Sequence, residues 1–413
     1  MLNRRDFVKG GAALVSIGTT AGSFLKGTIA FAAQNAAYVA PEGKGRILIL
    51  VQLAGGNDGL NTVVPVADPA YPAVRRTIGQ TLDMVLPLDR DFGLAPQLTG
   101  LKGLWDGGKL AIVRGVGYPD QDYSHFKSMA IWEAGDPKLE LKTGWLGRSL
   151  DAMESQAHDP FFGFNIGGST PPELRGEKIP IPSVRDQADY GLKVQGKTAD
   201  ADPRNATLMK LYQQYPANSR YGVLLETTAE TALSSAKALA AVAATYKPAV
   251  EYPDTSFAQG LQLLAETIIG GLGIRVGHIT LGGFDTHNNE PEEHADLMTT
   301  LDEGLSAFYA DLAAQGRAGD VMVLTWSEFG RRVQENANKG TDHGSASVLF
   351  ALGDGVRGGF YGDQPSLTTL VDNGNLSFTT DFRSVYATVI EGWLGIPSAP
   401  LLGTQWATLG FVA

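Results

Sequence analysis

Five short runs of apolar residues constrain the fold of this chain more than any other feature. The first, at residues 46–53, reads Arg-Ile-Leu-Ile-Leu-Val-Gln-Leu and lacks the polar alternation of a surface strand. A continuous run rich in Ile, Leu and Val predicts a strand that is buried on both faces of a parallel sheet. Four similar runs follow along the chain, at 110–113, 275–281, 321–325 and 347–352.

Helical stretches separate these runs, at 96–106, 124–133, 256–269, 294–314 and 381–394. Strands that alternate with helices predict an α/β fold, in which helices cover both faces of a mostly parallel central sheet. Polar, helical sequence at about 184–255 interrupts the alternation and predicts an insertion. We therefore expect one α/β domain over 45–413 that carries this helical insertion.

The composition excludes several classes of protein. The chain has 413 residues, of which 43% are hydrophobic, and this apolar content is enough for a large core. A net charge of −11 argues against a nucleic-acid partner, because phosphate binding needs a basic face. The absence of cysteine excludes disulfide scaffolds, zinc fingers and iron–sulfur clusters. A metal site would have to use carboxylate, imidazole or hydroxyl ligands.

The first 32 residues have the features of an export signal. Arg4-Arg5 precedes a weakly apolar run at 10–25, and Ala30-Phe31-Ala32 provides small residues for cleavage. The arginine pair predicts twin-arginine export, a partnership with that export machinery, and a periplasmic or secreted product. The alternative is an N-terminal membrane anchor, for which sixteen residues with four glycines are short. Residues 33–44 read as a linker, and no later run is long enough for a stable membrane span.

Polar residues follow the apolar runs at the positions where a parallel sheet binds its ligands, beyond the carboxyl ends of its strands. Asp58 lies in a glycine-rich segment after the first run, where a turn and a ligand site are both possible. Asp285 and His287, two residues apart after the third run, can chelate one divalent ion. The other candidates near these loops are Glu328, Asp342, His343 and His294.

Ser124 opens a predicted helix, where serine is a common N-cap residue. The same position faces free backbone N–H groups that favour a bound anion, and a nearby metal ion would make the hydroxyl a nucleophile. Arg331 is a candidate for stabilising the negative charge that develops on a substrate oxygen.

Five segments together resemble the exported family known as domain of unknown function 1501, over essentially the whole chain after the signal. They are Gly-Gly-Asn-Asp-Gly-Leu-Asn (55–61), Tyr-Ser-His-Phe-Lys-Ser (123–128), Gly-Gly-Phe-Asp-Thr-His (282–287), Ser-Glu-Phe-Gly-Arg (327–331) and Thr-Asp-His-Gly (341–344). This family resembles a distant branch of the alkaline phosphatase/sulfatase superfamily. The resemblance implies a three-layer α/β/α fold and hydrolysis of phosphate or sulfate esters.

The resemblance also implies roles for individual residues. Ser124 corresponds to the nucleophile, and His343 to the last metal histidine. Asp285 and His287 correspond to a metal-binding pair, although the superfamily spaces that pair more widely; an alternative alignment uses Asp342 and His343 as the pair. Asp58 corresponds to the first metal aspartate, and Glu328 replaces another aspartate.

Two ion sites follow from these roles. Asp285, His287 and His343 would form a site suited to Zn²⁺. Asp58, Glu328 and the Ser124 hydroxyl would form an oxygen-only site for Mg²⁺, Ca²⁺ or Mn²⁺, weakened by Phe329 where the superfamily has a histidine. We expect a metal-dependent hydrolase of small anionic esters; the alternative is a non-catalytic binding or assembly protein with at most one structural metal.

Overall fold

The computed structural model describes residues 45–154, 161–185, 207, 210–211 and 233–413 except 373. The predicted signal at 1–32, the linker at 33–44 and most of the predicted insertion at 184–255 lie outside these residues. Of that insertion, the described part includes a helix over 233–243.

A nine-stranded sheet forms the centre of the described chain, in the order β13-β5-β12-β9-β1-β8-β6-β7 with β16 also beside β5. Its strands are β1 (Ile47–Ala54), β5 (Leu110–Gly117), β6 (Gly163–Ile166), β7 (Ser183–Val184), β8 (Val276–Gly282), β9 (Val321–Trp326), β12 (Ser347–Leu352), β13 (Gly359–Tyr361) and β16 (Thr380–Asp381). The five predicted strands are confirmed. The pairs are parallel except those of β12, which runs antiparallel to both β5 and β9.

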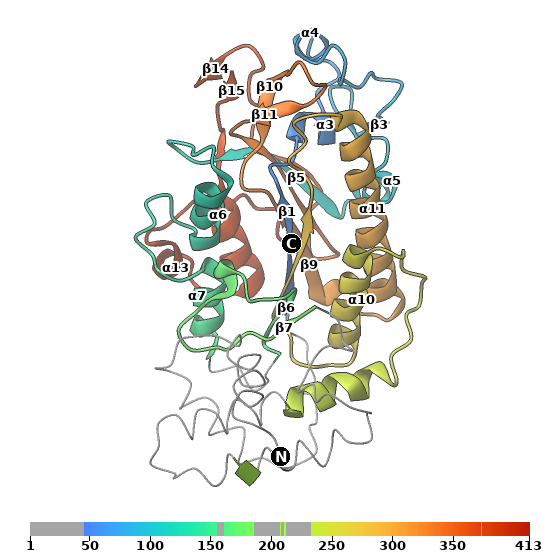
Figure 1. The fold of residues 1–413 in the computed structure, drawn as a ribbon, viewed down its shortest axis with the longest axis vertical. Coiled ribbons are helices and arrows are strands. Elements are labelled where there is room, and N and C mark those ends of the chain that lie inside the picture. The colour runs from blue at the N-terminus through green and yellow to red at the C-terminus, as the bar shows by residue number, and fades with distance from the viewer. Residues whose placement is uncertain (1–44, 155–160, 186–206, 208–209, 212–232, 373) are drawn as a thin grey trace, which may run out of the picture.

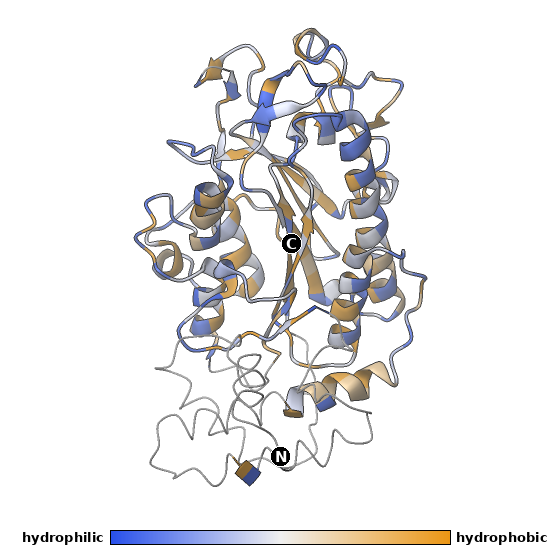
Figure 2. Cartoon of the chain, in the orientation of Figure 1, coloured by the Kyte–Doolittle hydropathy of each residue, from blue (hydrophilic) through white to orange (hydrophobic). Residues whose placement is uncertain are grey.

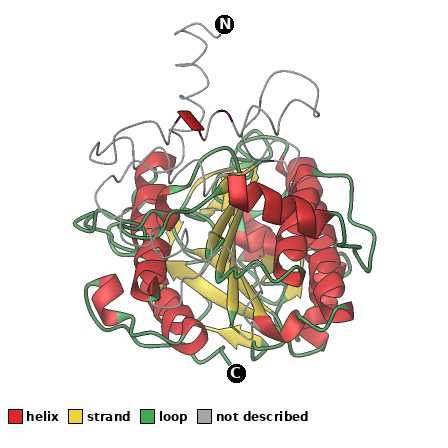
Figure 3. Ribbon diagram, turned by 90° about the horizontal axis from the view of Figure 1, so that it is seen from below, coloured by secondary structure: helices red, strands yellow, loops and turns green. Residues whose placement is uncertain are grey.

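Helices cover both faces of this sheet, which confirms the predicted α/β class (Figures 1 and 3). One face carries α5 (Thr99–Asp106), α10 (Ser256–Ile269) and α11 (Glu290–Ala314). The other carries α6 (His125–Ala134), α7 (Trp145–Ala152), α12 (Phe382–Ala387), the π-helix η6 (Thr388–Leu394) and α13 (Ala399–Leu402). Figure 2 shows the apolar residues concentrated in the strands and polar residues on the helix surfaces that face away from them.

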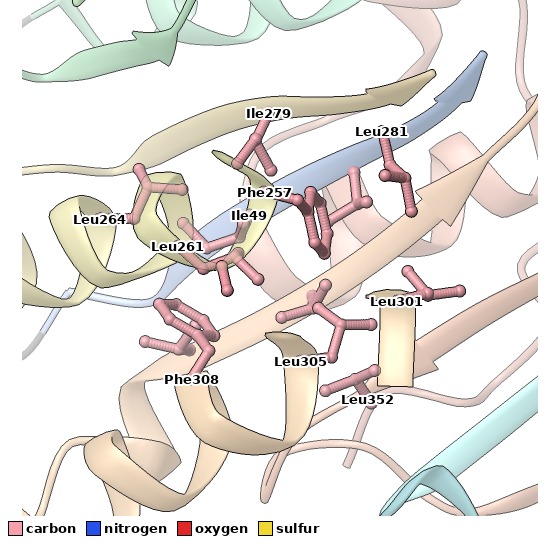
Figure 4. Close-up of a cluster of buried hydrophobic side chains, with 14 of the residues drawn as sticks. Ile49, Phe257, Leu261, Leu264, Ile279, Leu281, Leu301, Leu305, Phe308 and Leu352 are labelled. Atoms are coloured by element: carbon pink, nitrogen blue, oxygen red, sulfur yellow. The ribbon is translucent and has the colours of Figure 1, made fainter. Parts of the chain in front are cut away.

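The central strand β1 explains the two-faced core. Leu48, Ile49, Leu50 and Val51 are all fully buried. Ile49 and Val51 pack with α10 and α11, whereas Leu48 and Leu50 pack with the helices of the opposite face. Figure 4 shows Ile49 among the leucines and phenylalanines of the first face. A strand that is covered on both sides needs apolar residues at every position, as its sequence provides.

Short elements join these layers. They are α3 (Gly59–Thr62), β2 (Val63–Val64), α4 (Tyr71–Val74), β3 (Leu86–Pro87), β4 (Gly93–Leu94), η2 (Pro172–Leu174), η5 (Ala318–Asp320), β10 (Arg331–Glu335), β11 (Thr341–His343), β14 (Leu370–Val371) and β15 (Asn375–Leu376). Among the described residues, no helix combines the length and apolar composition that crossing a membrane requires.

Strand direction brings distant loops to one edge of the sheet. β8 and β9 are parallel to β1, and β5 points the same way because it and β9 are both antiparallel to β12. The carboxyl ends of these four strands therefore lie at the upper edge in Figure 1, where α3, β10 and β11 are also found. The loops after β1, β5, β8 and β9 meet there.

We expect Leu305→Ala, in the core shown in Figure 4, to lower the free energy of unfolding by about 2–5 kcal/mol. Leu305 on α11 is fully buried, so the substitution removes packing and leaves a cavity. Urea denaturation measures the effect, and Leu82→Ala, at a side chain that is 65% exposed, is the matched control with a change within about 0.5 kcal/mol. An equal effect of both variants would contradict this core assignment.

Candidate metal centre

Four side chains from three loops converge at this edge of the sheet: His125, Asp285, His287 and His343. The Nε2 atoms of His287 and His343 are 2.9 Å apart. Asp285 Oδ1 lies 3.1 Å from each of them, and Asp285 Oδ2 lies 3.4 Å from His125 Nε2. His125, Asp285 and His343 form the group of potential metal ligands whose donor atoms all lie within 4.8 Å of one another in the described chain.

The local backbone explains how these side chains reach one point. His125 is the first residue of α6, directly after its N-cap residue Ser124. Asp285 and His287 follow β8, and Gly283 has a φ of +110°, which a residue with a side chain rarely adopts. His343 lies on β11, opposite Arg331 on β10.

The loop that carries His287 is tied to the turn between β10 and β11. Thr341 N–H donates to the Thr286 carbonyl at 3.1 Å, and the Asn336 side chain donates to the His287 carbonyl at 2.9 Å. Gly340 allows this close approach, because a Cβ there would collide with the His287 backbone. The contacts fix the spacing between the two histidine loops.

Each histidine turns its Nδ1 toward an acceptor. His343 Nδ1 donates to the Tyr123 carbonyl at 2.8 Å, and His125 Nδ1 lies 2.7 Å from the Glu328 carboxylate. His287 Nδ1 is 3.4 Å from Asp342 Oδ1. An acceptor at Nδ1 places the proton of a neutral imidazole on that nitrogen and leaves the Nε2 lone pair free, which is the usual arrangement of histidines that bind metals.

Four contacts among these groups are close to the separations between the ligands of one divalent ion, and the three residues whose donor atoms all lie within 4.8 Å of one another are His125, Asp285 and His343. Bonds of about 2.0–2.1 Å in a tetrahedral zinc site separate the ligand atoms by roughly 3.3 Å. The contacts among the Nε2 and carboxylate oxygen atoms here are 2.9, 3.1, 3.1 and 3.4 Å. Two Nε2 lone pairs that face each other at 2.9 Å repel unless a proton or a cation lies between them. The donor set of His125, Asp285 and His343, two imidazoles and one carboxylate, suits zinc and similar transition-metal ions.

The electrostatics also favour a cation. Burial raises the pKa of Asp285, but the hydrogen bond and the charge of Arg331, followed by His287 and His125, outweigh burial and lower the pKa to about 2. Burial lowers the pKa of His343 below its ordinary value, against the hydrogen bond to the Tyr123 carbonyl. Asp285 is therefore ionised and His343 neutral at neutral pH, the states in which both bind metals.

Arg331 has a different position from the one predicted. It is 1% exposed, and its guanidinium donates to backbone carbonyls of the surrounding loops and to Asp285 Oδ1 at 2.7 Å. The carbonyls are those of Gly55, Gly56, Phe284 and Thr341. A guanidinium that is buried and committed to five acceptors does not reach a substrate, so the predicted contact of Arg331 with a substrate oxygen does not fit the structure. Arg331 orients Asp285 instead.

The predicted oxygen-only site is not assembled. Both carboxylate oxygens of the fully buried Asp58 accept from Arg75, at 2.5 and 3.1 Å, and one also accepts from Leu60 N–H. The Glu328 carboxylate accepts from Gly55 N–H and faces His125. In the described residues, Arg75 thus supplies the positive charge that the prediction assigned to a second ion, and Glu328 supports a histidine ligand.

The remaining predicted residues divide between the centre and its surroundings. Asp285, His287 and His343 come together as expected, with Asp342 beside His287. Ser124 is exposed at the start of α6, and its side chain makes no capping bond. His294 lies outside the group: it is buried, with Nε2 3.1 Å from Asn57 Oδ1 and 3.4 Å from Thr62 Oγ1.

His125 is the candidate ligand that sequence reasoning missed. The available signal was its place directly after Ser124, at a helix start that follows a buried strand, which is the position that made Ser124 a candidate. Successive side chains at a helix start diverge, so the sequence pattern does not show which of them approaches the other candidate ligands.

Residues 109–397 match the family described as "Protein of unknown function (DUF1501)". No curated protein matches the sequence.

Three similar solved structures are a sulfatase, a phosphonate monoester hydrolase and a lipoteichoic acid synthase. The PsFucS1 sulfatase from Pseudoalteromonas sp. is 12% identical, with a TM-score of 0.37 over 96% of this chain and 72% of that chain. The phosphonate monoester hydrolase SpPMH from Silicibacter pomeroyi is 11% identical, with a TM-score of 0.38 over 88% and 77%. The lipoteichoic acid synthase LtaP from Listeria monocytogenes is 10% identical, with a TM-score of 0.37 over 94% and 78%.

We expect His125→Ala to weaken zinc binding by roughly 100-fold or more, because it removes a ligand. Glu328→Gln should cost about 10- to 100-fold, because the acceptor that orients His125 is weakened. Competition with a chelator of known affinity measures both effects. His294→Gln removes an imidazole outside the centre and should leave the affinity unchanged; a loss in this control equal to that in His125→Ala would contradict the assignment.

The buried His294 predicts a specific pH dependence of stability. Burial, with the charges of Arg75 and Arg331, lowers its pKa from 6.5 to about 4 against the opposing effect of Asp58. Between these two values only the unfolded chain takes up the proton, so the free energy of unfolding falls as the pH falls from 6.5 to 4.

His294→Gln should remove roughly 3 kcal/mol of this pH dependence, since a glutamine does not titrate. Urea denaturation of both proteins between pH 7 and pH 4 measures the difference between their profiles. Parallel profiles would show that His294 titrates normally in the folded protein.

Proposed function

We propose that this chain, which belongs to the DUF1501 family, is a metal-dependent hydrolase of phosphate or sulfate esters. The family has no assigned activity, so the proposal rests on the site. The observation that carries the proposal is the convergence of His125, Asp285, His287 and His343, with each Nδ1 turned toward an acceptor. Such support of ligands is typical of a centre that binds an ion.

His125, Asp285 and His343 would hold one divalent ion, with His287 beside them. An ion bound there supplies Lewis-acid polarisation of an ester oxygen and lowers the pKa of water. Asp285 and His287 have side chains that are 47% and 41% exposed, so a substrate can approach the centre from solvent. A closed structural site would bury its ligands instead.

The start of α6 supports an anionic substrate. The first turn of a helix leaves backbone N–H groups without partners inside the helix, and the side chain of Ser124 does not cap them. These groups and the positive end of the helix dipole favour phosphate or sulfate beside His125. The exposed Ser124 hydroxyl is at the same helix start, which supports its proposed role as the nucleophile.

The second candidate is a non-catalytic binding or assembly protein with one structural metal. The observation that favours it is the ion pair between Asp58 and Arg75, which leaves one candidate ion centre in the described part of the chain. A single ion does not provide the two-ion clamp that stabilises both the attacking and the leaving oxygen.

The predicted export signal at Arg4-Arg5 and residues 10–25 supports a further part of the proposal: the protein works in the periplasm or outside the cell after twin-arginine export.

Assays of the zinc-loaded protein with aryl phosphate and aryl sulfate esters test the proposed activity. We expect turnover of one ester class, reduced by roughly 10³-fold or more in Ser124→Ala, because the nucleophile is lost. Ser169→Ala, at another exposed serine that is not among the residues of the centre, is the control and should retain full activity.

Two outcomes would contradict parts of this proposal. Turnover that survives Ser124→Ala but disappears in His287→Ala would refute the nucleophile while retaining the metal centre. Stoichiometric zinc without turnover of either ester class would favour the binding protein.

A further inference from the structure

Strand β8 leaves part of one face open to solvent next to the centre. Alternate residues of a strand point to opposite faces of the sheet, so Val276, Thr280 and Gly282 share the face that α6 and α7 cover. Val276 is fully buried there, but Thr280 and Gly282 are exposed. In the described residues, a Cβ at Gly282 would meet no atom within 4 Å beyond its chain neighbours, so the space above this residue is open. Asp285 of the centre lies on the loop that follows.

Helix α6 forms one side of this open strip of β8. The sulfur of Met129 on α6 lies 3.5 Å from Gln52 Nε2 on β1, and Gln52 Oε1 accepts from the Thr280 hydroxyl at 3.1 Å. His125 of the centre is about one turn before Met129, and Glu133 is about one turn after it. The spacing of four residues places these three side chains along one side of the helix. The strip therefore runs from the centre past Thr280 toward Glu133.

Glu133 is a partly buried carboxyl group without a direct partner. Within the described residues it makes neither a hydrogen bond nor an ion pair. Burial, followed by the charge of Glu173, raises the pKa of Glu133 to about 7, against the opposing charge of Arg175. Glu173 is fully buried and lies 2.8 Å from His278 Nε2 on β8, which shows that this end of α6 approaches the same strand. A nearby cation would favour the charged form of Glu133.

The polar groups along the strip accept hydrogen bonds. Thr280 gives its hydroxyl proton to Gln52, so its exposed oxygen is left as an acceptor. The carboxylate of Glu133 offers further acceptors and a negative charge. An ammonium group supplies both donors and a positive charge, and it complements this end of the strip. His125 and Glu133 lie about 12 Å apart along the axis of α6, which sets the length of a ligand that reaches both.

Resting on the proposed function, we propose that the ester bound at the centre has an elongated alcohol part, which lies along the open strip of β8 and ends in an ammonium group at Glu133. The substrate class is thus a zwitterionic ester of a long amino alcohol, in contrast to an ester of a short or uncharged alcohol. The centre binds the anionic head, and Glu133 contributes to specificity at the other end.

Calorimetric binding of non-hydrolysable anions to the zinc-loaded full chain tests this inference. The ligand 8-aminooctylphosphonate carries a distant amine, octylphosphonate has the same chain without the amine, and 2-aminoethylphosphonate has its amine close to the head. The corresponding sulfonates provide the same comparison for a sulfate-like head. We expect the long amine to bind about tenfold more tightly than the other two, which is roughly the effect of one charge-assisted hydrogen bond.

Three variants make the test specific. Glu133→Gln keeps the shape of the side chain and removes its charge, so the preference for the long amine over octylphosphonate should fall to near one. Gly282→Leu fills the open space on β8 and should weaken binding of both long ligands while leaving 2-aminoethylphosphonate unchanged. Glu303→Gln, at an exposed carboxylate of α11 on the opposite face of the sheet, is the matched control and should behave as the unmodified protein.

The outcomes separate this inference from the proposed function. Equal binding of the three phosphonates, or a preference for the long amine that survives Glu133→Gln, overturns the role of Glu133 while the proposed ester hydrolase stands. Unchanged binding of the long ligands to Gly282→Leu overturns the path along β8. Binding of no phosphonate or sulfonate to protein that holds zinc overturns both proposals. A change of oligomeric mass in Gly282→Leu, by light scattering, without a change of preference would assign the strip to contact between copies of the chain and overturn the inference as well.

Discussion

The buried guanidinium of Arg331 is the interaction on which the arrangement at the sheet edge depends. It donates to four backbone carbonyls from three loops and to the carboxylate of Asp285. A buried carbonyl that loses its donor, such as that of Gly56, costs about 1–3 kcal/mol. Gly55 and Gly56, with φ of +124° and +81°, let the first loop turn its carbonyls toward the guanidinium. One side chain thus fixes how the loops after β1 and β8 lie against the β10–β11 hairpin.

A second buried arginine explains why the described residues offer one candidate ion centre. Arg75 neutralises Asp58, and Arg75 Nη1 also lies 3.7 Å from Glu290. Burial and the charge of Asp58 raise the pKa of Glu290, whereas Arg75 outweighs burial and lowers the pKa of Asp58. The three side chains then hold one negative carboxylate, one protonated carboxyl and one guanidinium, which is neutral overall. A buried cation that is part of the protein replaces any need for a metal at Asp58.

The sequence predicts the layers better than the site, and particular residues show why. An apolar run such as 321–325 indicates a buried strand regardless of which strands pair with it. The bounds of β9 and of its neighbours were therefore predicted nearly correctly. The same apolar character says nothing of direction, so the antiparallel course of β12 was not predictable. Asp285, His287 and His343 were identifiable because they follow or precede such runs. Arg75 and His125 were not, because their roles depend on loop paths that join residues as far apart as His125 and Glu328.

The centre and the start of α6 form one rigid unit, which bears on how the proposed site would work. Ser128 on α6 donates to the Glu328 carbonyl and shares a hydrogen bond of 2.9 Å with the Tyr118 hydroxyl. The loop after β9 therefore holds α6 both through its backbone and through the carboxylate that faces His125. Because these partners are buried, the helix cannot shift without breaking several hydrogen bonds at once. The free N–H groups of its first turn keep their distance from the ion ligands before any substrate arrives, and such preorganisation is what electrostatic stabilisation of a reacting anion requires.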